Sequence, residues 1–255
     1  MAVYSVEVSM KKLLPAIALA VTVGACTSAV TRLTPKPNHT VHPDSEWESP
    51  ESEDEMDILI PAYNPLLSKD PTEQLLMRFR GQDRKGPKTS IAPGSKQTFA
   101  SIEALIATLP GDQAMRNHTP PLEKTTNTRF VEEQRNVKVT AWIYAIKYEA
   151  DQDWHIILGT NPTDTTPTYF NAEVSGLPPN NSPAYQKLKK VREDLAEMFD
   201  YDLPASGYWQ YEPVAVVVEG SLFYDIDHPP GAVGPKESKP TTAWEIHPIT
   251  KLREQ

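Results

Sequence analysis

The order of strand-like and helix-like segments in the C-terminal half restricts the fold of this chain more than any other feature of the sequence. Residues 137–148 are rich in β-branched and aromatic side chains and predict a long strand. Residues 154–159 and 168–175 predict two further strands. The segment between the first two, residues 149–152, has the length of a hairpin turn.

A helix is expected after the third strand. Ser182 is a suitable N-cap, and Pro183 is a suitable first helical residue. Apolar residues then recur on one helical face, with Lys and Glu opposite, at Tyr185, Leu188, Val191, Leu195, Met198 and Phe199. Residues 213–224 and 242–252 predict two final strands.

Three strands, a helix and two strands are the order of elements in the OB-fold, a five-stranded Greek-key barrel. We therefore predict a mainly β fold, with an OB-like barrel over residues 134–255 and the helix between strands three and four. A long first strand suits this barrel because it pairs along both of its edges. An open α+β sheet with the same order of elements is the alternative.

A charged and then apolar segment lies near the N-terminus. Lys11 and Lys12 precede an apolar run that ends in small residues and Cys26, the one cysteine among 255 residues. This is the layout of a secretory signal peptide, and the run is shorter than the about 20 residues of a membrane-spanning helix. Residues 23–26, Val-Gly-Ala-Cys, resemble the lipobox of bacterial lipoproteins, which implies cleavage before Cys26 and attachment of lipid to it.

The lipobox resemblance implies a lipid-anchored protein of the bacterial cell envelope, whose partner is the membrane. Thr27 stands where an aspartate would favour the inner membrane, so the outer membrane is favoured. We expect a signal peptide over residues 1–25, with Met1 or Met10 as the start, and an acidic, proline-rich tether over 26–57. Residues 58–133 are expected to form an extension with short helices, at 72–80 and around Ile102, Leu105, Ile106 and Leu109.

Composition excludes several classes of function. The formal net charge of −9 disfavours non-specific binding of nucleic acid, which depends on clustered Lys and Arg. A single cysteine permits no intramolecular disulfide and provides no cysteine-ligated metal site. The 25 prolines and 39% apolar residues indicate one folded domain with much irregular chain.

Histidines beside acidic residues are the candidate chemical groups. His155 follows the acids of residues 149–153, His228 follows Asp225, and His247 lies two residues after Glu245. Strand alternation places Glu245 and His247 on one face. Such a set suits either a buried polar network or a metal or acid–base site. We expect the network, with no metal and no cofactor; the alternative is a divalent metal such as zinc on His155, His228 and His247.

Three motifs carry a second resemblance. Glu149-x-Asp151-x-Asp153-x-His155, Gly220-x-x-Phe223-x-Asp225-x-x-His228 and Glu245-Ile246-His247-Pro248 resemble a pattern of secreted bacterial proteins of unknown function. The resemblance covers about residues 129–252, implies an OB-like barrel and implies no activity. The insert at residues 229–242 departs from the shorter connection expected.

Aromatic residues on the first three strands suggest a ligand face, because OB-folds bind oligonucleotides and oligosaccharides there. The candidates are Trp142, Tyr144, Trp154 and Tyr169. Without a basic groove, sugar or peptide is the expected ligand. The competing interpretation is that alternate aromatic side chains fill the barrel.

The sequence as a whole predicts an envelope lipoprotein that acts as a binding or interaction module, with a saccharide or another envelope protein as partner. A metal-dependent hydrolase that uses the histidines with Asp225 or Glu245 is one alternative. A structural lipoprotein with no small ligand is the other. Whether the chain is an enzyme stays open at this point.

Overall fold

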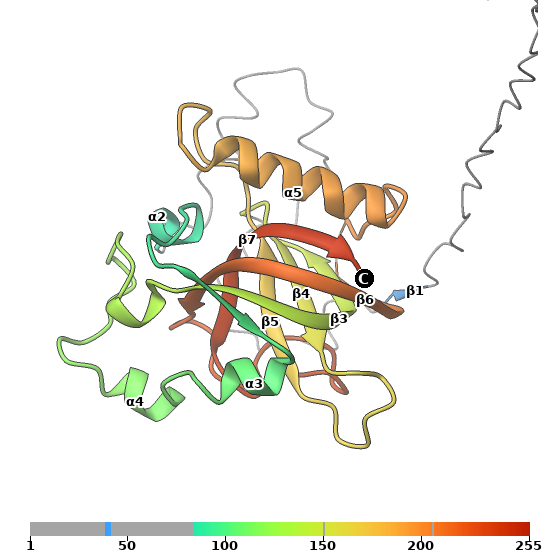
Figure 1. The fold of residues 1–255 in the computed structure, drawn as a ribbon, viewed down its shortest axis with the longest axis horizontal. Helices are drawn as coiled ribbons and strands as arrows, with labels where there is room; N and C mark the ends of the chain where they lie inside the picture. Colours follow the sequence, from blue (N-terminus) through green and yellow to red (C-terminus); the bar gives the residue numbers. More distant parts are fainter. Residues whose placement is uncertain (1–38, 42–83, 150, 206) are drawn as a thin grey trace, which may run out of the picture. The chain divides into compact units, whose positions relative to one another are not determined.

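The computed structural model describes residues 39–41, 84–149, 151–205 and 207–255 (Figure 1). The expected signal peptide, Cys26, the helix at 72–80 and most of the tether lie outside the described residues. In chain order the elements are β1 (His39–Val41), α2 (Lys85–Lys88), β2 (Lys96–Phe99), α3 (Ile102–Ile106), α4 (Asp112–Arg116), η3 (Val131–Glu133), β3 (Asn136–Tyr148), β4 (Trp154–Gly159), β5 (Tyr169–Val174), α5 (Tyr185–Met198), β6 (Tyr208–Tyr224) and β7 (Trp244–Glu254).

The five strands of the C-terminal half pair in a closed ring. β3 pairs with β4, β4 with β5, β5 with β7, β7 with β6, and β6 again with β3. The β5–β7 pairing is parallel and the others are antiparallel. The predicted mainly β class and the predicted order of strands and helix are therefore confirmed.

The long strand β3 pairs with other strands along both of its edges. One edge pairs with β6 along almost the whole strand. The other edge pairs first with β2, in parallel, and then with β4. The register against β6 shifts between Ile143, which pairs with Val214, and Ala145, which pairs with Gln210. Pro213 lies within this irregularity, where its missing N–H costs no ladder hydrogen bond, so β6 begins earlier than predicted.

Two strands were not predicted. β1 lies inside the segment expected to be a structureless tether and pairs with β6 at Trp209–Tyr211. β2 lies in the extension, where only helices were expected. Neither segment has the apolar alternation of a strand, because both pair at the margin of the sheet. Their partners on the sheet decide their conformation.

The side chains of one sheet face form the main hydrophobic cluster, and we call this the inner face. It includes Val139, Ile156, Ala172, Ile246 and many others. α5 packs its apolar stripe onto this cluster and lies across β7 (Figure 1). Val191, Leu195 and Phe199 belong to the same cluster as the inward side chains of the strands.

The ends of α5 and α3 differ from the prediction by a few residues. α5 begins at Tyr185, because Pro183 and Ala184 form a turn in which the Ser182 hydroxyl accepts a hydrogen bond from the Ala184 N–H at 3.3 Å. α3 is confirmed, with the Ser101 side chain as its N-cap. None of the helices in the described part of the chain has both the length and the apolar character that crossing a bilayer requires.

Leu195 provides a test of the packing of α5. Its side chain is fully buried, so Leu195→Ala should lower the free energy of unfolding by about 2–5 kcal/mol, the cost of truncating a buried leucine. Glu197→Ala, at an exposed position of the same helix, should change it by less than about 0.5 kcal/mol. Denaturant unfolding of the two variants measures the difference, and equal effects would contradict this packing.

Candidate functional site

Strand alternation separates polar from apolar side chains on β4, β5 and β7. Ile156, Ala172 and Ile246 point to the inner face. Their neighbours point to the opposite, outer face, where buried polar side chains gather: His155, Asn171, Glu173, Glu245 and His247. The strand registers place these side chains side by side, because His155 pairs with Glu173 and Asn171 pairs with Glu245.

His155 lies between two carboxylates. Its Nδ1–H donates to Glu149 Oε1 at 2.9 Å, and its Nε2 lies 3.8 Å from Glu173 Oε1. The ring is buried, which alone would lower its pKa, but the adjacent Glu149 carboxylate raises the pKa of His155 to about 10. Glu149 is the last residue before the β3–β4 turn, so the hairpin itself brings the two side chains together.

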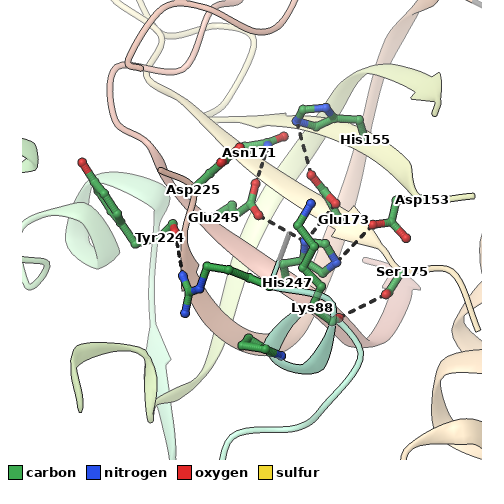
Figure 2. A network of polar contacts seen from close by, with 12 residues as sticks. Lys88, Asp153, His155, Asn171, Glu173, Ser175, Tyr224, Asp225, Glu245 and His247 are labelled. Atoms are coloured by element: carbon green, nitrogen blue, oxygen red, sulfur yellow. Dashed lines mark hydrogen bonds and ion pairs between the residues drawn. The ribbon is translucent and has the colours of Figure 1, made fainter. Parts of the chain in front are cut away.

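His247 has three carboxylates around its ring (Figure 2). Its Nδ1 lies 2.9 Å from Glu173 Oε2 and 3.1 Å from Glu245 Oε1, and its Nε2 lies 3.4 Å from Asp153 Oδ2. The other oxygen of Glu245 accepts a hydrogen bond from Asn171 Nδ2 at 2.7 Å. Glu173 therefore faces His155 with one oxygen and His247 with the other.

The β3–β4 turn positions Asp153. The Glu149 N–H donates to the Asp153 carbonyl at 3.0 Å, and the Gly176 N–H donates to Asp153 Oδ1. Gly176 is needed at this place, because a Cβ there would lie 2.8 Å from the Asp151 carbonyl oxygen. One carboxylate oxygen of Asp153 is thus held by backbone, and the other is directed at His247.

The segment around α2 covers this outer face. The Arg129 guanidinium donates to the carbonyls of Pro87, Ser90 and His247, at 2.6, 2.6 and 3.0 Å. The Ser175 hydroxyl donates to the Lys88 carbonyl at 3.1 Å. These bonds fix the main chain of α2 against β5 and β7, so the carboxylates beneath it are enclosed.

Two lysines of α2 lie at the rim of the cluster. The Nζ atoms of Lys85 and Lys88 each lie 3.9 Å from Asp151 Oδ2, with side chains 18% and 20% exposed. Burial opposes the charge of Lys88, but Asp151 and the other surrounding carboxylates raise its pKa well above the usual value. The two ammonium groups offset part of the negative charge of the cluster.

Crowding of carboxyl groups leaves several of them with raised pKa values. Burial is the largest cause for Glu173, Glu245 and Asp151, and neighbouring carboxylates add to it. Burial also raises the pKa values of Glu149 and Asp153, but nearby cationic groups act against it. The pKa of Glu149 is lowered because His155 lies beside it. The pKa of Asp153 is lowered because Lys85 and His247 lie near it. Three of the five carboxyl groups in the cluster therefore hold their protons more tightly than usual.

Five buried polar atoms of the cluster have no hydrogen-bond partner among the described residues: Asp153 Oδ2, His155 Nε2, Asn171 Oδ1, Glu173 Oε2 and His247 Nε2. The distance of 3.4 Å between Asp153 Oδ2 and His247 Nε2 is too long for a good hydrogen bond. It matches the roughly 3.3–3.6 Å that separates two ligand atoms placed tetrahedrally at about 2.0–2.2 Å from one metal ion. The spacing of these two atoms is compatible with ligation of one ion as well as with an ion pair.

Within the described residues, two groups of side chains place one ligand atom each within 4.8 Å of one another. The first group is Asp153, Glu173 and His247, and the second is Glu149, His155 and Glu173. A mixture of imidazole and carboxylate ligands suits zinc, manganese or ferrous iron. The cluster is therefore able to hold a divalent cation.

The structure divides the candidate residues of the sequence into two sets. His155, His247 and Glu245 lie in the cluster. His228 and Asp225 pair with each other at its rim, where His228 Nδ1 donates to Asp225 Oδ2 at 2.6 Å. His228 belongs to neither metal-competent group of the described residues, so the three histidines do not form one ligand set.

Glu173, Asn171, Asp153 and Lys88 were not among the candidate site residues. A signal for two of them is present in the sequence. In the segment Phe170-Asn171-Ala172-Glu173-Val174 polar residues alternate with apolar ones, and this pattern marks a polar sheet face. The sequence gives no sign that the face is buried, because its cover comes from α2, more than 80 residues earlier in the chain.

The candidate aromatic residues also lie on two faces. Trp154 belongs to the main hydrophobic cluster, between the Tyr148 ring and the Arg192 guanidinium. Tyr144 and Tyr169 pack edge to face with ring centroids 5.2 Å apart. Trp142 is half-buried and lines a depression of about 510 Å³ together with Ser101, Glu103, Thr140, Thr160, Asn161, Asp164 and Ala100.

In comparisons with known proteins, no protein-family model matches this chain and no curated protein matches it.

Proposed function

We propose that this chain is a lipid-anchored protein of the bacterial envelope whose OB-like barrel binds a divalent metal ion in the buried histidine and carboxylate cluster. The observation that carries the metal-binding function is the group of Asp153, Glu173 and His247. Its ligand atoms lie within 4.8 Å of one another, and three of its buried polar atoms have no hydrogen-bond partner among the described residues.

A polar network alone accounts less well for these contacts. In such a network each buried polar atom is paired, since an unpaired one costs about 1–3 kcal/mol. Asp153 Oδ2 and His247 Nε2 are buried and lie 3.4 Å apart, and neither has a hydrogen bond within the described part of the chain. A cation between them would satisfy both atoms.

The OB-like barrel is supported by the closed ring of strand pairings and by the place of α5 between the third and fourth strands of that ring. In this proposal the metal lies on the outer face of the ring and not among the inward apolar side chains. Metal binding is also the first requirement of the hydrolase alternative, and the rim lysines Lys85 and Lys88 would suit an anionic substrate there.

Metal analysis of the full-length, tag-free protein tests this function. We expect about one or more equivalents of a divalent metal per chain, and less than a tenth of that in Glu173→Gln. At a free metal concentration about 100 times Kd, binding adds about 2.7 kcal/mol of stability. Adding metal to chelator-treated protein should therefore raise Tm by about 5–10 °C.

Glu103→Gln is the matched control, because Glu103 is an exposed acid on α3 far from the cluster in sequence and on another element. It should retain the metal content and the Tm shift of the wild-type protein. The proposal would be contradicted if wild-type protein carried no metal after reconstitution with Zn²⁺, Mn²⁺ and Fe²⁺ and if these ions did not change its Tm. The cluster would then be a polar network only.

The envelope location rests on the resemblance of residues 23–26 to a lipobox. Because the Cys26 thiol is the acceptor, Cys26→Ser should abolish lipid attachment and release the protein from the membrane fraction or leave it unprocessed. Mass spectrometry of the mature wild-type protein should show a lipid-modified N-terminal cysteine. An unmodified Cys26 in membrane-derived protein would contradict the anchor.

The depression beside Trp142 favours a saccharide as a second ligand, because a half-exposed aromatic ring among hydroxyl, amide and carboxylate groups suits a sugar. Trp142→Ala should weaken binding of a chito-oligosaccharide about tenfold or more, measured by titration calorimetry. Tyr201→Ala, which removes an exposed aromatic ring elsewhere, should leave binding unchanged. Failure of the wild-type protein to bind would remove this candidate.

A further inference from the structure

The two metal-competent groups of the cluster share one residue. Glu173 belongs to both groups, with Asp153 and His247 in one and with Glu149 and His155 in the other. Its two oxygens are divided between them: Oε1 lies 3.8 Å from His155 Nε2, and Oε2 lies 2.9 Å from His247 Nδ1. A carboxylate with one oxygen directed to each of two ligand sets is placed as a bridge.

The two histidines have matching surroundings. His155 Nδ1 donates to Glu149, and His247 Nδ1 contacts Glu245. In both rings Nε2 is buried and has no hydrogen-bond partner among the described residues. The structure thus places, once on β4 and once on β7, a buried histidine that has carboxylates beside its ring and one unpartnered nitrogen.

Each group has a carboxylate that the other lacks. Glu149 directly follows β3 and belongs only to the His155 group, whereas Asp153 directly precedes β4 and belongs only to the His247 group. The β3–β4 hairpin therefore supplies one acid to each side of Glu173.

We propose that the cluster holds two divalent cations, one at Asp153, Glu173 and His247 and one at Glu149, His155 and Glu173, bridged by the carboxylate of Glu173. This inference rests on the metal binding proposed above and adds the second ion. Bridged pairs of this type lie about 3.5–4 Å apart and act on both oxygens of a displacement at phosphorus or carbon. Because the ligands are imidazole and carboxylate groups, the expected ions are Zn²⁺, Mn²⁺ or Fe²⁺.

The experiment is the metal stoichiometry of the full-length, tag-free protein after chelation and reconstitution with Mn²⁺. Wild-type protein should bind about two equivalents, and Glu173→Gln should bind less than about 0.2. His155→Ala and the milder Glu149→Gln should each bind about one, because they remove ligands of the second ion only. His228→Ala is the control and should bind two, since His228 belongs to neither group.

Electron paramagnetic resonance of the Mn²⁺-loaded protein provides a second readout. Two bridged ions should give an exchange-coupled spectrum in wild-type protein, and Glu149→Gln should give the six-line spectrum of an isolated ion. One equivalent in wild-type protein, unchanged in Glu149→Gln and His155→Ala, would overturn the second ion and leave single-ion binding intact. Two equivalents without coupling would overturn the bridge, and no bound metal would overturn both proposals.

Discussion

The burial of ionisable side chains on the outer face of β4, β5 and β7 is the constraint on which the rest of the structure depends. A buried carboxylate is costly unless it is paired. Glu173 and Asp153 are almost fully buried, so a histidine, a backbone N–H or a cation must accompany each of them. The β3–β4 turn, Gly176 and the α2 segment meet these needs, and each comes from a different part of the chain.

The two faces of the same strands have different tasks. On the inner face, apolar side chains and the stripe of α5 form the hydrophobic cluster that stabilises the ring of strands. On the outer face, the same alternation presents histidines and acids to α2 and the hairpin turn. The hydrophobic cluster and the polar cluster thus lie on opposite faces of the same strands, and we expect outer-face variants such as Glu173→Gln to leave the inner-face packing unchanged.

Much of the fold was predictable from local pattern, and part of the site was. Residues 154–159 form β4 as predicted, and Leu188, Val191 and Leu195 are the buried stripe of α5. His155, His247 and Glu245 were correctly singled out as neighbours of acids. β1, β2 and the early start of β6 were missed, because pairing at a sheet margin and a bulge at Pro213 leave no periodic signal in the segment itself.

The sequence by itself determined the order of strands and helix, the two faces of each strand and the presence of histidines among acids, since all three follow from short-range spacing. Only the tertiary structure decided that His247 and His155 share Glu173, that His228 stands apart with Asp225, and that α2 encloses the cluster. These facts depend on the parallel pairing of β5 with β7 and on contacts between distant segments. Spacing along the chain does not encode which carboxylate a buried histidine will meet.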